Sequence, residues 1–302
     1  MRSLSEVVRR RGGVMSTAEF LAFGASSHAL TAAVRSGVLL RPRQGWYVLP
    51  STREDYVRAL RVGGRLASVS AAATYGLAVP HEFHLHVHVA HESSRLRTES
   101  DRYVRLSDVA GETTVIHRGR VSPPTLATRL RVGLLDCLLQ VVTTESEDDA
   151  VACVDSALRL GLLDSEGIEW LRKRLPARRQ CILDRADGKS DSYPESICRC
   201  KLARAGIETR LQVPVLGERW IDLLIGDHLA IEVDGAAKYT QDMTPAQVAR
   251  RMNADRVRDA FLEAIGFHVI RISYFMVMFD WPATLGMIQA VMERGEHLSR
   301  RR

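Results

Sequence analysis

Residues 219–235 have the sequence RWIDLLIGDHLAIEVDG and predict a tight β-hairpin in the last third of the chain. Two apolar runs of strand length flank a turn at 226–228. If the turn is centred on its middle residue, Asp222 and Glu232 lie opposite each other. Asp234 shares the face of Glu232, because side chains alternate along a strand. Three carboxylates are therefore expected on one face of an otherwise apolar hairpin.

These carboxylates would repel one another unless a cation neutralised them. Oxygen ligands favour a hard divalent ion, so the pattern predicts Mg²⁺ or Mn²⁺ as the cofactor. Such an ion can orient a water, lower its pKa and stabilise the charge that develops on a phosphate during hydrolysis. The alternative is three acids facing solvent on an exposed sheet. Carboxylates are poor strand residues, and Glu232 and Asp234 lie in apolar sequence, so we favour the metal site.

Glu195 is an acid upstream of the hairpin. It follows Ser192 at the spacing of a capping box, in which the glutamate accepts the N-cap amide hydrogen. A role beside the metal and this capping role can coexist, and both stay open. The run 211–215, between Glu195 and the hairpin, is expected at a sheet edge, because Pro214 has no N–H to donate to a neighbouring strand.

A long helix after the hairpin is predicted to start at Thr244 and to stop at Gly266. Its arginines would bind DNA phosphates, since a guanidinium fork matches two phosphate oxygens. Alternatively they would pair with acids one turn away. The residues predicted to contact DNA here are Arg250, Arg251 and Arg258, with Arg271 on the following strand. The periodicity of Arg271 also suits a half-buried position beside an acid.

Residues 192–290 resemble the PD-(D/E)XK nuclease superfamily, and within it the branch of Vsr-like (very-short-patch-repair) endonucleases. The resemblance rests on Glu195, on Asp222 with Glu232, on AIEVDG at 230–235, on DRVRD at 255–259 and on GFHVIR at 266–271. It implies a restriction-endonuclease-like αβ domain, in which helices flank a mixed sheet.

The resemblance also implies roles for individual residues. Asp222 and Glu232 would bind the metal ion, with the carbonyl of Val233 as a third ligand. Glu195 would lie in the outer shell or bind a second ion.

This chain departs from the family pattern at one catalytic position. The usual lysine falls where Asp234 stands. Lys238 would take over that role, or a metal-bound water would need no such helper. If neither holds, the domain is inactive and serves only to bind DNA.

Residues 3–49 predict three short helices and then a two-stranded hairpin, the order of a winged helix-turn-helix. The alternative is any three-helix bundle with a hairpin. In the winged form the third helix enters the major groove and basic residues of the hairpin contact phosphates. The predicted DNA-binding residues are His28, Thr31 and Arg35 on the third helix, and Arg41 and Arg43 on the hairpin.

The first 190 residues resemble the AbiEi-type antitoxin or transcriptional-regulator architecture of bacteria. The resemblance rests on GWYV at 45–48, LLD at 134–136 and VDSAL at 154–158. It implies DNA as a partner, and a toxin–antitoxin or defence-system protein as a further one.

The middle of the chain contains a histidine-rich segment. His84, His86 and His88 fall on one face of a predicted strand. Neither a carboxylate nor a cysteine completes a ligand set nearby in sequence, and one flat strand suits a tetrahedral metal poorly. We therefore expect this face to contact solvent or a partner. Further strands are predicted at 103–106 and 113–117, and a polar linker at 176–192.

The predicted fold class is an α/β multidomain protein with three parts. They are a winged helix-turn-helix domain at 1–55, an AbiEi-like α+β domain at 56–187 and a PD-(D/E)XK nuclease domain at 188–302. A net charge of +6 leans toward a polyanionic partner. Five cysteines without a Cys-x-x-Cys pair favour a reducing cytosol. With neither a signal peptide nor a membrane span expected, a cytoplasmic, nucleoid-associated protein is predicted.

Together these patterns predict a DNA-binding, divalent-metal-dependent endonuclease that hydrolyses phosphodiester bonds. The alternative is a transcriptional regulator or antitoxin-like DNA-binding protein whose nuclease-like domain is inactive. A third possibility is a protein-interaction module that uses the histidine-rich strand. A homodimer is compatible with each of them.

Overall fold

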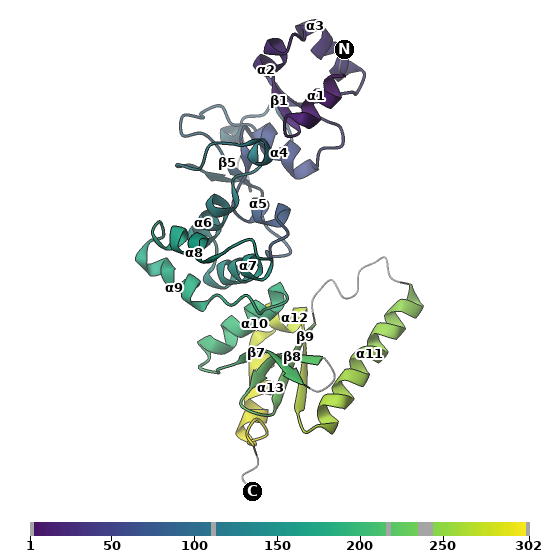
Figure 1. The fold of residues 1–302 in the computed structure, drawn as a ribbon, viewed down its shortest axis with the longest axis vertical. Coiled ribbons are helices and arrows are strands. Elements are labelled where there is room, and N and C mark those ends of the chain that lie inside the picture. The colour runs from purple at the N-terminus through teal and green to yellow at the C-terminus, as the bar shows by residue number, and fades with distance from the viewer. Residues whose placement is uncertain (1–2, 110–112, 216–218, 235–243, 300–302) are drawn as a thin grey trace. The chain divides into compact units, whose positions relative to one another are not determined.

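The computed structural model describes residues 3–109, 113–215, 219–234 and 244–299 (Figure 1). The chain divides into two compact units, one of residues 1–145 with 169–176, the other of 146–168 with 177–302. Each unit combines helices with β-sheet, so the expected mixed α/β multidomain class is confirmed.

The first 50 residues of the N-terminal unit form three helices and a small sheet. The elements are α1 (Leu4–Arg10), β1 (Val14–Ser16), α2 (Thr17–Ala22), α3 (Ser27–Arg35), β2 (Leu40–Arg43) and β3 (Trp46–Val48). The expected order of helices and hairpin is present, with one addition: β1 pairs with β3, giving the strand order β1-β3-β2. Ser16 and Glu19 form the capping box that starts α2. Phe20, Leu30 and Tyr47 fill the core beneath α3.

The rest of this unit surrounds a second small sheet. Its elements are α4 (Glu54–Val62), β4 (Arg65–Leu66), α5 (Ser68–Thr74), β5 (His86–His88), the 3₁₀ turns η1 (Leu106–Asp108) and η2 (Leu126–Thr128), β6 (Val115–His117) and α6 (Leu134–Thr144). The strand order is β4-β5-β6, with β6 parallel to β5. The strand expected at 103–106 was wrong: this segment forms a turn that joins Arg97 through a single bridge at Arg105.

The histidine-rich strand β5 is buried, so the expectation of a solvent-facing or partner-facing surface was wrong for His86 and His88, whereas His84, before the strand, is exposed. His86 and His88 are each 6% exposed. The parallel strand β6 brings His117 onto the same face, and its Nε2 lies 3.0 Å from Nδ1 of His86. Nδ1 of His86 is also 3.5 Å from a carboxylate oxygen of Glu145. Burial, and then the neighbouring histidines, lower the pKa of His117 to about 4.

This buried pair should make stability depend on pH. Folding depresses the pKa of His117, so the unfolded chain binds more protons between about pH 6.5 and pH 4. The unfolding free energy should therefore fall by about 3 kcal/mol as the pH is lowered through this range. Urea unfolding followed by circular dichroism at pH 7.5, 6, 5 and 4 measures the fall. His117→Gln should flatten the curve, whereas His84→Gln, an exposed control, should not. Parallel curves for all three proteins would contradict the assignment.

The C-terminal unit holds a four-stranded sheet between helices. Its elements are α7 (Glu147–Arg159), α9 (Ala177–Arg185), α10 (Tyr193–Arg204), β7 (Arg210–Val215), β8 (Arg219–Ile225), β9 (Leu229–Asp234), α11 (Pro245–Ala264), β10 (His268–Ser273), α12 (Tyr274–Met278) and α13 (Trp281–Glu293); α8 (Ser165–Arg172) runs from this unit into the other. The strand order is β10-β9-β8-β7, with β10 parallel to β9 and the other pairs antiparallel. The expected mixed sheet, with β7 and its Pro214 at an edge, is confirmed.

The expected linker at 176–192 is largely helical. Residues 177–185 form α9, and Ile182 and Leu183 are buried. α9 packs on α7, which also packs on α10. α9 buries only one narrow apolar stripe, so most of its residues are polar. This polar composition is why the sequence indicated a linker.

Candidate functional site

The predicted register of the β8–β9 hairpin is confirmed. Leu223 pairs with Ile231 and Leu224 with Ala230, the alignment that sets position 222 across from position 232. The backbone pairing stops one step short of these acids. Instead, Oδ2 of Asp222 accepts the N–H of Val233 at 2.9 Å. At this step the side chain of Asp222, and not a backbone carbonyl of β8, accepts the hydrogen bond from β9.

The acids at 222 and 232 share one cation from the chain itself. Nη2 of Arg258, on α11, lies 2.9 Å from Glu232 Oε2 and 3.9 Å from Asp222 Oδ1. The same guanidinium donates to the carbonyl of Trp220. We expected Arg258 to bind DNA phosphates. The structure turns it toward the buried Glu232 and the half-buried Asp222, whose carboxylates carry the opposite charge.

The charge at this position is only partly balanced. Glu232 is 3% exposed, and its Oε1 has no hydrogen-bond partner among the described residues. Burial, and then the charge of Asp222, raise the pKa of Glu232 to about 7, although Arg258 and Arg271 oppose the shift. This oxygen of Glu232, next to the carboxylate of Asp222, is one that a hard divalent cation could bind.

Asp234 does not join these two acids, so the convergence of three carboxylates was wrong. Its Oδ1 accepts from Nη1 of Arg271 at 3.0 Å. Arg271 also binds Asp259 of α11, at 2.6 Å. The alternative of a half-buried Arg271 paired with acids is confirmed.

Glu195 lies at the start of α10 and is 4% exposed. It accepts from the N–H of Asp191 at 2.9 Å and from the hydroxyl of Ser192 at 2.7 Å. The glutamate therefore caps the helix through Asp191 rather than through the Ser192 amide. Burial, and then the charge of Asp222, raise its pKa to about 7, which places it in the electrostatic field of the site.

Gln212 also contacts the site, which was not predicted from the sequence. Its φ is +45°, a left-handed conformation that is unusual for a glutamine within a strand. Its side-chain amide donates to Glu195 at 3.3 Å. The β7–β8 pairing skips the step at Gln212 and Asp222. Strain of this kind persists where surrounding contacts hold it, and its sequence signal is absent because no glycine marks it.

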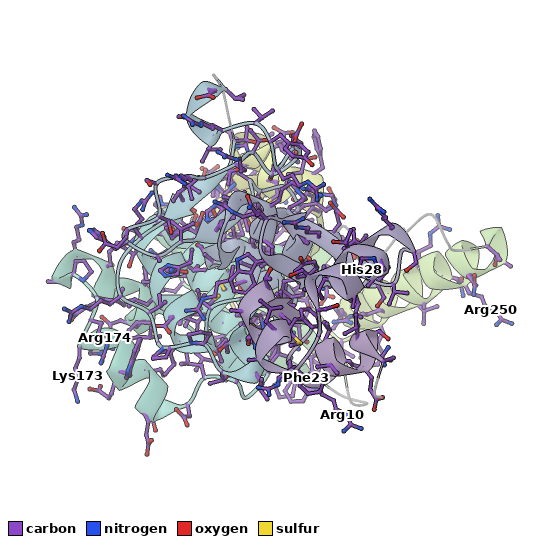
Figure 2. All side chains as sticks on the ribbon, turned by 90° about the horizontal axis from the view of Figure 1, so that it is seen from above. Arg10, Phe23, His28, Lys173, Arg174 and Arg250 are labelled. Carbon is purple, nitrogen blue, oxygen red and sulfur yellow. The ribbon has the colours of Figure 1, made fainter. Side chains whose placement is uncertain are left out.

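The remaining predicted residues of this unit fall into two groups. Arg250 is exposed and projects from α11 (Figure 2). The side chain of Arg251 and all of Lys238 lie outside the described residues. Among those described, no group of three or more His, Cys, Asp or Glu side chains is arranged to hold a metal ion. The protein's own candidate ligands are therefore Asp222 and Glu232, with the Val233 carbonyl untested.

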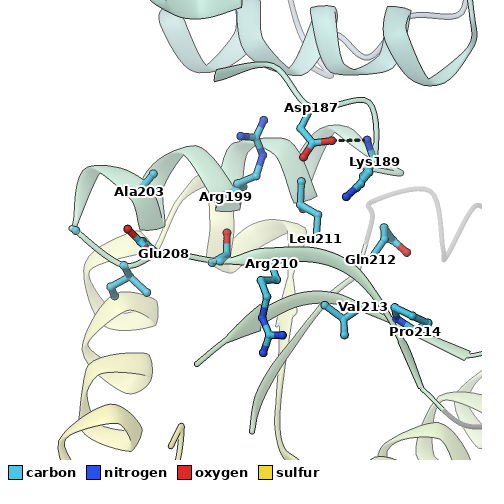
Figure 3. A pocket seen from close by; sticks show the side chains of 13 residues that line it. Asp187, Lys189, Arg199, Ala203, Glu208, Arg210, Leu211, Gln212, Val213 and Pro214 are labelled. Carbon is cyan, nitrogen blue, oxygen red and sulfur yellow. Dashed lines mark hydrogen bonds between the residues drawn. The ribbon is translucent and has the colours of Figure 1, made fainter. Parts of the chain in front are cut away.

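A cavity of about 850 Å³ lies beside the edge strand β7 (Figure 3). Its walls include Leu211, Gln212 and Arg199. None of the four candidate acids at 195, 222, 232 and 234 lines it. The volume of this cavity is therefore no evidence that it takes part in the predicted hydrolysis.

The N-terminal candidate site is the outer face of α3. His28, Thr31 and Arg35 are exposed, whereas Leu30 and Ala33 on the opposite face are buried. Figure 2 shows His28 at the surface. The three exposed residues follow the helical repeat, so they form one continuous stripe.

The hairpin β2–β3 presents only one of its two predicted arginines. Arg41 is exposed. Arg43 is half-buried, and its Nη1 donates to the carbonyl of Val62 at 2.6 Å. The structure thus uses Arg43 to satisfy the last turn of α4, where helix carbonyls lack partners.

The N-terminal part of the chain matches a known family. Residues 2–50 match the family model described as a transcriptional regulator, AbiEi antitoxin. No curated protein matches the chain. The match supports a DNA-binding regulator or antitoxin domain at the N-terminus, and it does not extend to the acidic pair. Within the described residues, no helix has the length and apolar character to cross a membrane.

Proposed function

We propose that this protein is a DNA-binding transcriptional regulator or antitoxin in which residues 3–49 act as a winged helix-turn-helix. The exposed stripe of α3 carries the proposal, because it lies in the region that matches the AbiEi antitoxin model. In this arrangement α3 enters the major groove and β2–β3 forms the wing. DNA is the partner, at the nucleoid, with a toxin or defence protein as a further one.

The chemistry of the α3 stripe suits DNA. Arg35 can donate to guanine edges or to phosphates, and His28 and Thr31 offer further polar groups at the same face. Ser26 caps the helix by accepting the N–H of Ala29 at 3.1 Å, which holds the N-terminal turn in place. Arg41 of the wing would contact a phosphate.

The double variant Thr31→Ala/Arg35→Gln tests this proposal. It should weaken binding to a duplex selected from a random library by at least about 30-fold, since each lost base contact costs about 1–3 kcal/mol. Fluorescence anisotropy at fixed salt measures the change. Arg159→Gln, in the last turn of α7, is the matched control, because Arg159 is also exposed and ends a helix. Equal affinity of the double variant and the wild type would exclude α3 as the reading helix.

A second candidate activity is divalent-metal-dependent phosphodiester hydrolysis by the C-terminal unit. The specific observation in its favour is that the buried Oε1 of Glu232, beside Asp222, has no hydrogen-bond partner within the described part of the chain. Both carboxylates would hold Mg²⁺ or Mn²⁺, which when bound supplies a polarised water and neutralises phosphate charge. Arg258 would leave the pair as the ion enters. Its guanidinium is then placed to bind the phosphate. Glu195, with its raised pKa, would accept a proton near neutral pH.

A further inference from the structure

The N-terminal unit contains a cavity of about 440 Å³ whose walls are strongly basic. It lies where the hairpin β2–β3 meets the segment 95–103. Five arginines line it, namely Arg41, Arg43, Arg95, Arg97 and Arg102, and Tyr103 stands at its side. The volume falls within the range of small-ligand sites.

The charge in this cavity is not balanced by the protein. Among the described residues, none of the five arginines forms an ion pair with a carboxylate. The nearest acids in sequence have other partners: Glu99 pairs with Arg58 at 2.6 Å, and Asp101 accepts the N–H of Tyr103 at 2.8 Å. Burial, and then the charge of Arg97, lower the pKa of Arg43. Guanidinium groups gathered in this way repel one another unless an anion joins them.

Internal bonds hold the walls of the cavity in place. Arg102 donates to the carbonyl of Arg41 and, at 2.9 Å, to the hydroxyl of Tyr103. The segment 97–105 folds back on itself, with Thr98 buried and its hydroxyl donating to Asp101 at 2.9 Å. The cavity is therefore a built feature and not a chance gathering of mobile side chains.

We propose that this cavity is a binding site for phosphate groups. Arginine is suited to this ligand, since its planar fork donates two parallel hydrogen bonds to phosphate oxygens. Tyr103 is 76% exposed, so its ring can lie against a sugar or a base. The phosphates belong either to a nucleic acid strand or to a free nucleotide.

The position of the cavity bears on these two sources. Arg41 belongs both to the wing and to the cavity wall, so a duplex held by the wing would have its backbone continue into the cavity. In this nucleic acid form the inference rests on the proposed DNA-binding function. The free-nucleotide form does not depend on it.

The test compares the full-length wild type with Arg95→Gln. Arg95 lines the cavity, is exposed and lies outside the wing, so the substitution leaves the proposed wing contact of Arg41 in place. Arg178→Gln, an exposed arginine of the other unit, is the control. Anisotropy with a labelled 20-base-pair duplex and calorimetry with ATP are measured at several salt concentrations. Thermal unfolding confirms that the variants are folded.

If the source is a nucleic acid strand, Arg95→Gln should bind the duplex about 10-fold more weakly. The slope of log affinity against log salt should fall by about 1, because one phosphate contact is lost. If the source is a free nucleotide, ATP binding falls about 10-fold and duplex binding is unchanged. Less than a twofold change in both arms would overturn the proposal. If duplex binding falls with Thr31→Ala/Arg35→Gln but not with the cavity variant, the proposed DNA-binding function stands and the cavity takes no part in it.

Discussion

Asp222→Asn is expected to reduce Mg²⁺-dependent cleavage of plasmid DNA by about 100-fold or more. Loss of a residue that merely orients a metal ligand costs about 10–100-fold, and a direct ligand should cost at least as much. The substitution keeps the shape of the side chain and can retain an oxygen for the N–H of Val233. Thus the fold of the hairpin should survive while the charge that would hold the proposed ion is lost.

Asp227→Asn is the matched control, because Asp227 lies in the turn of the same hairpin with its side chain 57% exposed. Metal binding has an independent readout: MgCl₂ should raise the thermal midpoint of the wild type and of Asp227→Asn, but not of Asp222→Asn. Undiminished cleavage by Asp222→Asn would remove the site assignment. Failure of the wild type to cut duplex, nicked, mismatched or single-stranded DNA would leave a regulator without hydrolytic activity.

The second large effect concerns stability. Asp155→Ala should lower the unfolding free energy of the C-terminal unit by about 3–5 kcal/mol, the usual cost of leaving one partner of a buried ion pair alone. Asp155 is 1% exposed. It accepts from Arg199 at 2.8 Å, from the hydroxyl of Ser196 at 2.7 Å and from the N–H of Asp187 at 2.7 Å. One carboxylate therefore joins α7, α10 and the segment between α9 and α10.

Chemical denaturation of the wild type and of two variants measures this effect. Asp164→Ala is the control, since Asp164 is exposed and its side chain accepts the N–H of Gly167 within the same short turn. Its loss should cost about 1 kcal/mol, as for an ordinary helix cap. Similar losses for both substitutions would show that Asp155 is not the central contact described above.

Local signals predicted part of this fold well. The capping residue Thr244 starts its helix where expected, because its side chain accepts an N–H group of the first turn. The hairpin register at 222–232 followed from strand periodicity and a short turn. Both features depend on residues within about ten positions of one another, and sequence patterns report such contacts directly.

Long-range contacts explain what the sequence did not predict. The burial of His86 depends on β6, almost 30 residues later in the chain. The inward position of Arg258 depends on acids carried by two other elements. A charged side chain near a candidate site can bind either solvent phosphate or a protein carboxylate, and periodicity does not separate these outcomes. The basic cavity was missed for the same reason, since Arg41 and Arg95 are far apart in sequence.

The guanidinium of Arg258 has a consequence for how the proposed hydrolytic site would be loaded. A bare acidic pair would attract any passing divalent ion, whereas this one is already neutralised in part by α11. An ion that binds there has to displace the guanidinium of Arg258. Activation would then exchange the arginine for the metal ion, and the position of the Arg258 side chain on α11 would differ between the two states.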